Sequence, residues 1–131
     1  MAEMFSDAWM KRFMESWNAE QDLVEPLSSI GFNSVIGYGY PGEPTARGYL
    51  DVQNGKAVDA GAFNGQNLNW DLRAKAEQWE KWMASPPGMT GLGGAFMTGK
   101  IKFLVGDYKA MLKEPRMAGP FIKSFSVMGK V

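Results

Sequence analysis

The hydrophobic pattern opens with aromatic side chains at every fourth position: Phe5, Trp9, Phe13 and Trp17. Such spacing places them on one face of a helix, for which Ser6 or Asp7 is a suitable N-cap. A second helix is predicted at about residues 20–29, with Gly31 as its stop. We interpret the aromatic stripe as core, because an amphipathic helix normally buries such a face.

From residue 32 the pattern alternates, and one face of a predicted strand carries Phe32, Ser34, Ile36, Tyr38 and Tyr40. Residues 41–44, Pro-Gly-Glu-Pro, end this strand. Residues 47–53 and 56–63 are predicted to pair as a hairpin, because the Asn54-Gly55 dipeptide between them accepts the positive φ angles of a tight turn.

Residues 67–73 alternate strictly, which predicts a strand with one buried and one solvated face. Its apolar side carries Leu68, Trp70 and Leu72, and its polar side Asn69, Asp71 and Arg73. Solvent exposure is therefore predicted for Asp71 and Arg73. Asp51, Asp59 and Asp71 could instead pair for acid–base chemistry. Solvated surface is the better interpretation, because their positions alternate with apolar residues.

The rest of the chain predicts a helix at 75–84, a short helix within the glycine-rich segment 88–99, a strand at 100–105, a helix from 108 to about 113 and a final helical stripe. Pro115 and Pro120 are expected to interrupt the last part. This order predicts an α+β fold in a single domain, residues 1–131, with a five-stranded mixed or antiparallel sheet covered on one face by helices.

The composition removes several classes of chemistry. The chain has no Cys and no His, which excludes thiolate nucleophiles, Ser-His-Asp triads and the usual zinc ligands. Lys plus Arg and Asp plus Glu each number 14, so no overall charge attracts nucleic acid. We expect no enzyme activity, no catalytic residue, no metal, no cofactor and no nucleic-acid partner.

Targeting signals are not recognised in the sequence. Glu3 and Asp7 stand where a secretory signal would be apolar, and no stretch reaches the roughly 18 apolar residues of a membrane span. The last residues, Met-Gly-Lys-Val, differ from a peroxisomal Ser-Lys-Leu address. A cytoplasmic location is the expectation.

Residues 94–103, Gly-Ala-Phe-Met-Thr-Gly-Lys-Ile-Lys-Phe, resemble the segment that leads from a short helix into the last strand in the sterol carrier protein type 2 family. Residues 106–113, Gly-Asp-Tyr-Lys-Ala-Met-Leu-Lys, are similar to the helix that follows there. Residues 68–72 and 78–83 resemble the family's preceding strand and helix. The first half of the chain matches only in the order and length of its elements.

This resemblance implies an apolar cavity between sheet and helices, in which family members bind long-chain fatty acids, acyl-CoAs, sterols or other lipids. The expected ligand contacts are Trp79, Met83, Phe96, Met97, Phe103, Met111, Leu112, Phe121 and Phe125. Pro115, Gly119 and Pro120 depart from the family pattern, so a sterol is not implied for this chain. They also make the C-terminal helix around Pro120 the expected movable lid.

Alternatives stay open at several positions. Of the 10 Met residues, five in the second half suit either an adaptable pocket or ordinary core packing: Met83, Met97, Met111, Met117 and Met128. An indole N–H of Trp70, Trp79 or Trp82 could reach a ligand instead of only packing sheet to helix. The glycine-rich segment lacks phosphate-loop spacing. A basic bias comes from Lys100, Lys102, Lys109, Lys113, Arg116 and Lys123. It represents plain surface charge or attraction for a fatty carboxylate, an acyl-CoA phosphate or, in transient contact, an anionic membrane.

The alternative function belongs to another class. The same fold could serve as an accessory or interaction subunit that docks on a partner enzyme, or on itself as a homodimer, without binding lipid.

Overall fold

The computed structural model describes residues 3–131, except for the side chains of Met89 and Leu112. Its strands are β1 (Ser34–Gly39), β2 (Gly48–Gln53), β3 (Lys56–Ala62), β4 (Trp70–Arg73) and β5 (Lys102–Val105). They form one sheet in the order β3-β2-β1-β4-β5. The β1–β4 pair is parallel and the other neighbours are antiparallel, which confirms the predicted five-stranded mixed sheet.

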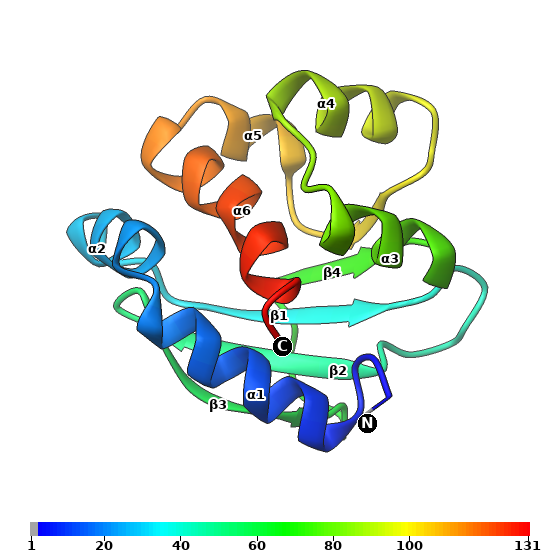
Figure 1. Ribbon diagram of the computed structural model, residues 1–131, viewed down its shortest axis with the longest axis horizontal. Helices are drawn as coiled ribbons and strands as arrows, with labels where there is room; N and C mark the ends of the chain where they lie inside the picture. Colours follow the sequence, from blue (N-terminus) through cyan, green and yellow to red (C-terminus); the bar gives the residue numbers. More distant parts are fainter. Residues whose placement is uncertain (1–2) are drawn as a thin grey trace.

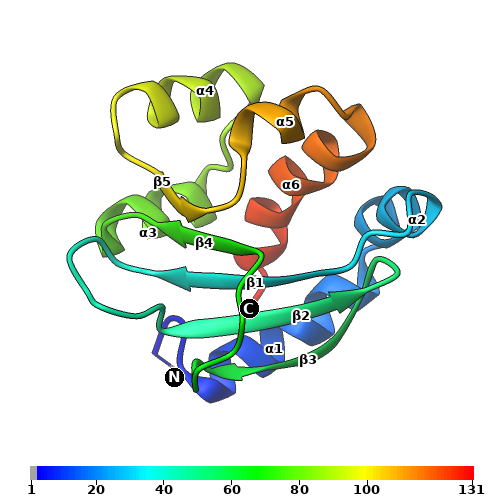
Figure 2. The ribbon, with the colours of Figure 1, turned by 180° about the vertical axis from the view of Figure 1, so that it is seen from behind.

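The helices are α1 (Asp7–Ala19), α2 (Gln21–Ser29), α3 (Ala76–Ala84), α4 (Met89–Met97), α5 (Tyr108–Leu112) and α6 (Pro115–Met128). They gather on one face of the sheet (Figure 1), and the view from behind places the strands in front of them (Figure 2). Helix α1 lies across β2 and β3, while α6 packs against α1, α2, α3 and α5. The α+β architecture with one covered face is therefore confirmed.

Helix α1 begins as its sequence predicts, because the Ser6 hydroxyl accepts a hydrogen bond from the Trp9 N–H at 3.3 Å. Its buried face consists of Trp9, Met10, Phe13 and Trp17. Neighbouring rings along this face meet at centroid distances of 5.4 and 5.9 Å. The interpretation of the aromatic stripe as core is confirmed.

The hairpin between β2 and β3 turns at the predicted dipeptide. Asn54 and Gly55 have φ angles of 52° and 84°, the left-handed values that a tight hairpin turn requires. A Cβ on Gly55 would lie 2.5 Å from the backbone nitrogen of Ser28, so this turn packs directly onto α2. The Gly55 carbonyl also accepts a hydrogen bond from the Trp17 indole at 3.0 Å, which ties the turn to α1 as well.

The prediction that Asp71 and Arg73 face solvent is wrong. Both are buried, and they form a bidentate pair with N···O distances of 2.7 and 3.0 Å. The physical reason is the loop between β1 and β2, which folds over this end of the sheet. The Arg73 guanidinium donates to the Tyr40 and Glu43 carbonyls of that loop at 3.2 and 2.9 Å. Alternation alone cannot show that a loop covers the second face of a strand.

Of the two expected interruptions, the one at Pro115 is present, because α5 ends at Leu112 and α6 begins at Pro115, whereas the one at Pro120 is absent. Pro115 occupies the first turn of α6, where its missing N–H costs no hydrogen bond. Pro120 lies inside the continuous helix and removes only the bond to the Arg116 carbonyl. Burial of Phe125 and Met128 further along α6 holds the helix in place. The C-terminal helix is thus an integral part of the core.

Candidate functional site

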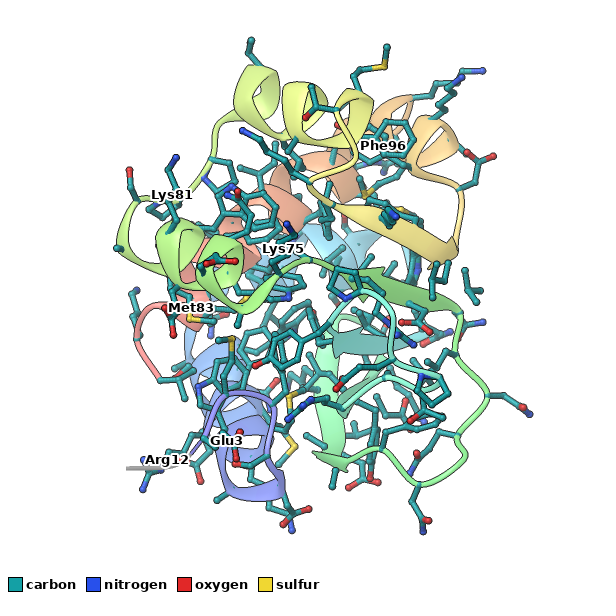
Figure 3. All side chains as sticks on the ribbon, turned by 90° about the vertical axis from the view of Figure 1, so that its right-hand side faces the viewer. Glu3, Arg12, Lys75, Lys81, Met83 and Phe96 are labelled. Carbon is teal, nitrogen blue, oxygen red and sulfur yellow. The ribbon has the colours of Figure 1, made fainter. Side chains whose placement is uncertain are left out.

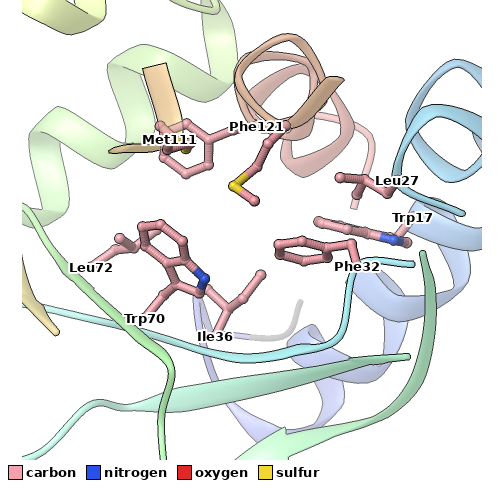
Figure 4. Close-up of a pocket in the computed structure, with 9 residues that line it drawn as sticks. Trp17, Leu27, Phe32, Ile36, Trp70, Leu72, Met111 and Phe121 are labelled. Atoms are coloured by element: carbon pink, nitrogen blue, oxygen red, sulfur yellow. The ribbon is translucent and has the colours of Figure 1, made fainter. Parts of the chain in front are cut away.

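An apolar pocket lies between the sheet and the helices (Figure 4). Its lining consists of Trp17, Leu27, Phe32, Ile36, Trp70, Leu72, Met111, Met117 and Phe121. No lining residue is charged. The pocket therefore occupies the place in the fold where the sequence resemblance implies a cavity.

The floor of the pocket comes from the two parallel strands. The register of β1 and β4 sets Ile36 beside Trp70, and Leu72 follows two residues later on the same face. The Trp70 indole N–H is near the Ser34 hydroxyl at 3.3 Å, which turns the ring toward the helices. The floor is thus held in place by the backbone ladder between β1 and β4.

The helices supply the other walls. Trp17 comes from the end of α1 and Leu27 from α2, whereas Met111 belongs to α5. Met117 and Phe121 stand four residues apart on α6, so they share one face of that helix. Two of these wall residues are methionines, whose unbranched side chains adapt to ligands of different shape.

The volume of the pocket is small, about 30 Å³. On this measure it has room for about two water molecules, whereas sites for drug-sized ligands span roughly 300 Å³ or more. The lining side chains of Met111, Met117 and Phe121 come from α5 and α6. An acyl chain would enter only after some of these side chains, or the helix that carries them, had moved.

The structure distributes the nine residues expected from the sequence over three environments. Met111 and Phe121 line the pocket. Trp79 and Phe125 are fully buried in the neighbouring core, with the Trp79 indole donating to the Gly39 carbonyl at 3.0 Å. The remaining described residues of this set, Met83, Phe96, Met97 and Phe103, lie outside the pocket lining. The side chain of Leu112 lies outside the described part of the structure.

Phe96 and Phe103 nevertheless connect to the pocket through a run of ring contacts that we call the aromatic bridge: Phe96, Tyr108, Phe103 and Phe121. Phe96 lies between α4 and α5 (Figure 3) and stacks on Tyr108 at a centroid distance of 4.3 Å. Tyr108 contacts Phe103 at 5.2 Å, and Phe103 contacts the pocket residue Phe121 at 6.0 Å. The bridge therefore runs from α4 to the pocket wall.

Met83 and Met97 have different surroundings. Met83 is partly buried on α3 and packs against the core. Met97 ends α4 with 81% of its surface exposed, so the closed structure does not bring it to the pocket. The nine expected contacts leave out seven pocket residues, of which Met117 and Trp70 were considered only as alternatives: Trp17, Leu27, Phe32, Ile36, Trp70, Leu72 and Met117. The apolar face predicted for 67–73 was the signal that could have added Trp70 and Leu72.

The glycine-rich segment and the acidic side chains, the other candidates for chemistry, have the geometry of ordinary secondary structure and side-chain contacts. The glycine-rich segment folds largely as α4, which has no phosphate-loop shape. Asp51 and Asp59 face each other across the hairpin, and Asp59 accepts a hydrogen bond from the Tyr49 hydroxyl at 2.7 Å. Among the described residues, no cluster of acidic side chains is suited to hold a metal ion. Within the same part of the chain, no helix has both the length and the apolar character needed to cross a membrane.

The basic residues near the end of the chain also have identifiable partners. Lys123 and Lys130 lie 3.7 and 3.2 Å from the carboxylate of Glu20, and together they lower its pKa. Arg116 pairs with Glu114 at 3.2 Å. Part of the basic bias is therefore ordinary surface charge that is paired with acidic residues.

Solved structures with the same architecture include sterol carrier proteins. A crystal structure of sterol carrier protein 2 matches with a TM-score of 0.78 at 17% identity, over 98% of this chain and 99% of that one. The solution structure of a Thermus thermophilus protein, described as a candidate sterol carrier protein, matches at 0.70 and 16%, over 96% and 90%. UbiJ-SCP2, a ubiquinone synthesis protein, matches at 0.61 and 12%, over 95% and 90%.

The sequence itself matches no protein-family model, and a search of curated proteins finds no significant match. The three structural likenesses extend over nearly the whole chain, including the first half, where the sequence resembles the family only in the order of its elements.

Proposed function

From the sterol carrier protein 2 fold, which this chain has, we propose that the protein binds, and transfers, an apolar ligand without catalysing a reaction. The ligand class is a long-chain fatty acid, an acyl-CoA or a sterol-like lipid. The observation that carries the proposal is the uncharged pocket between sheet and helices. Its wall carries two methionines, Met111 and Met117, and its floor comes from the paired strands β1 and β4.

Burial of apolar surface would supply the affinity. Each buried methylene contributes about 0.8 kcal/mol, so a chain of about 15 methylenes gains about 12 kcal/mol before costs. Lost translational and rotational freedom costs about 4–15 kcal/mol, and the opening of the pocket adds to that cost. Moderate affinity that depends on the ease of opening is the expected result.

The proposed ligand wall combines both groups of residues. Met111 and Phe121 line the pocket already, and Phe96 and Phe103 extend it along the aromatic bridge. Trp79, Met83 and Phe125 would support the wall from the adjoining core, while Met97 and Leu112 complete the set expected from the sequence. No cofactor or metal takes part in this proposal.

A fluorescent fatty-acid titration, together with native mass spectrometry of gently purified protein, tests the proposal. Met117→Trp places a larger side chain in the pocket wall and is expected to weaken binding at least tenfold. Val58→Trp is the control, because it adds the same side chain at a position on β3 that is 53% exposed and outside the pocket lining. The proposal fails when the wild-type protein neither carries nor takes up lipid, or when both variants lose affinity equally.

A second candidate function is an accessory role, in which the fold docks on a partner enzyme or on a second copy. The structural likeness to UbiJ-SCP2, a ubiquinone synthesis protein, favours this alternative, as does the small cavity. Exposed apolar side chains support it too, since Met97, Leu104 and Val105 lie on α4 and the edge strand β5. Concentration-dependent dimerisation in sedimentation experiments, without lipid uptake, would decide for this role.

A cytoplasmic location is part of the proposal. A chain without Cys needs no oxidising compartment to fold, which is compatible with the reducing cytoplasm. Transient contact with a membrane during ligand exchange belongs to the same proposal. Transfer of a labelled fatty acid from vesicles, measured with and without anionic lipid, tests that contact.

A further inference from the structure

The hydroxyl of Tyr108 is buried and has no hydrogen-bond partner among the described residues. Tyr108 begins α5, and only 4% of its surface is exposed. A buried phenol hydroxyl nearly always has a protein or solvent partner. The indole N–H groups of Trp17 and Trp79 follow this rule, each at 3.0 Å from a backbone carbonyl. Tyr108 therefore holds a donor that the closed protein leaves unused.

Tyr108 is the second residue of the aromatic bridge, next to Phe96 of α4, and the apolar pocket lies at the other end. The Tyr108 ring stacks on Phe96 and contacts Phe103, which in turn contacts the pocket residue Phe121. A ligand that occupied the pocket and displaced Phe103 would extend toward Tyr108 and α4. Its far end would then reach the Tyr108 hydroxyl, the polar group that this apolar route offers.

Helix α4 covers the hydroxyl, and its sequence makes it easy to move. A Cβ on Gly93 of α4 would lie 3.8 Å from the Tyr108 oxygen, so helix backbone and hydroxyl are neighbours. Three of the nine residues of α4 are glycines inside the helix, and its N-cap residue makes no side-chain hydrogen bond. Interior glycines weaken a helix, and α4 lies at the edge of the molecule, away from α1 (Figure 1).

We infer that Tyr108 anchors the head group of the ligand by donating a hydrogen bond to an oxygen acceptor on it when α4 moves aside. This inference rests on the proposed lipid-binding function and narrows its ligand class. The ligand is an amphiphile whose apolar body fills the pocket and whose oxygen-bearing head, a carboxylate above all, lies beneath α4. Burial raises the pKa of Tyr108 above its ordinary value, so the hydroxyl keeps its proton at neutral pH and acts as a donor.

The exchange Tyr108→Phe tests the inference, because it should act on stability and binding in opposite directions. Without ligand, the variant loses an unpaired buried polar group, so its urea midpoint should equal or exceed that of the wild type. With ligand, it loses the anchor, and affinity for a pyrene-labelled dodecanoic acid should fall about tenfold or more. Affinity for the corresponding pyrene-labelled dodecane, which has no head group, should stay within about twofold.

Tyr49→Phe is the matched control. It also removes a tyrosine hydroxyl, but this one donates to Asp59 at 2.7 Å in the hairpin, away from the pocket lining. Its urea midpoint should fall, and its affinity for both probes should not change. If the Tyr108 hydroxyl had only a structural role, Tyr108→Phe would give the same result as this control, a lower urea midpoint with unchanged affinity for both probes.

Two results overturn the inference while the proposed function stands: a lower urea midpoint for Tyr108→Phe, or equal changes in its affinity for the two probes. If the wild-type protein binds neither probe, the proposed function fails and the inference fails with it. Selective loss of the acid probe, with an unchanged or higher midpoint, supports the inference.

Discussion

Exchanging Asp71 for asparagine would remove one charge from a buried pair and leave the other in place. The carboxylate accepts two hydrogen bonds from Arg73, at 2.7 and 3.0 Å, and the two side chains are 10% and 2% exposed. In Asp71→Asn the guanidinium keeps the carbonyls of Tyr40 and Glu43 as acceptors, but its charge has no partner within the pair. The closeness of the pair and the depth of its burial together set the size of the effect.

Breaking one side of a buried pair typically costs about 3–5 kcal/mol. A domain of this size has a total stability of roughly 5–15 kcal/mol, so the variant is expected to lose a large part of it. In urea, with a slope of about 1.5 kcal/mol per M, the midpoint should fall by about 2–3 M at unchanged slope. Tryptophan fluorescence can follow the transition, since Trp79 and Trp82 are buried in the core.

Glu43→Gln provides the control for this experiment. It removes the carboxylate partner of Arg47, also held by two short hydrogen bonds, but the two side chains are 33% and 40% exposed. Exposed pairs contribute only about 0–1 kcal/mol. The double exchange Asp71→Leu with Arg73→Met should cost less than Asp71→Asn, because no charge stays buried. The reasoning is refuted if Asp71→Asn costs less than about 1 kcal/mol or no more than the control.

The remaining predictions concern α4 and the hairpin. Gly94→Ala adds a Cβ that meets no atom within 4 Å, so it should stabilise the protein by about 0.5–1 kcal/mol and slow ligand uptake in stopped-flow fluorescence. Gly119→Ala in α6 should stabilise the protein similarly without slowing uptake, and equal rates in the two variants would contradict movement of α4. The hydrogen bond to Asp59, with burial, raises the pKa of Tyr49 to about 12. The folded state therefore holds this proton more tightly than the unfolded state does. The stability advantage of the wild type over Tyr49→Phe should be complete below about pH 10 and should disappear as the pH rises toward about 12. A constant difference between the two urea midpoints across this range would refute the prediction.

Features set by neighbouring residues were predictable from the sequence. The period of four in the first helix, the cap at Ser6 and the turn at Asn54-Gly55 each depend on a few adjacent positions. The alternation in 67–73 likewise predicted that Trp70 and Leu72 face the helices, and both line the pocket. The sheet and the helical layer followed from the order of these elements.

Features set by distant segments were not predictable in the same way. The burial of Asp71 depends on a loop about 30 residues earlier in the chain, whose carbonyls receive the Arg73 guanidinium. Ile36 became a pocket residue only through the register of β1 against β4. No periodicity within either strand encodes that pairing, so the pocket floor was missed.

The pocket residues also divide into those that the sequence indicated and those that depend on distant segments. The family resemblance pointed to the second half of the chain, and Met111 and Phe121 from that half do line the pocket. Trp17 was assigned to the core because its spacing is that of a core stripe, and it is indeed buried. It also lines the pocket, because the last turn of α1 ends where the layer of helices leaves a gap. A residue at such a boundary serves both purposes, which its spacing alone does not reveal.

The size of the pocket determines how a ligand would have to enter. A volume of about 30 Å³ must grow roughly tenfold, and the strand floor cannot yield without breaking the β1–β4 ladder. Helix α6 packs against α1, α2, α3 and α5. Helix α4, which has three interior glycines, lies beyond the pocket lining, so we expect α4 and the adjoining α5 to be the side that moves. If the open form makes up about 1% of the molecules, the observed affinity is about 100-fold weaker than that of the open form. Substitutions that stiffen α4 should then weaken binding without touching the ligand, and substitutions that loosen it should strengthen binding.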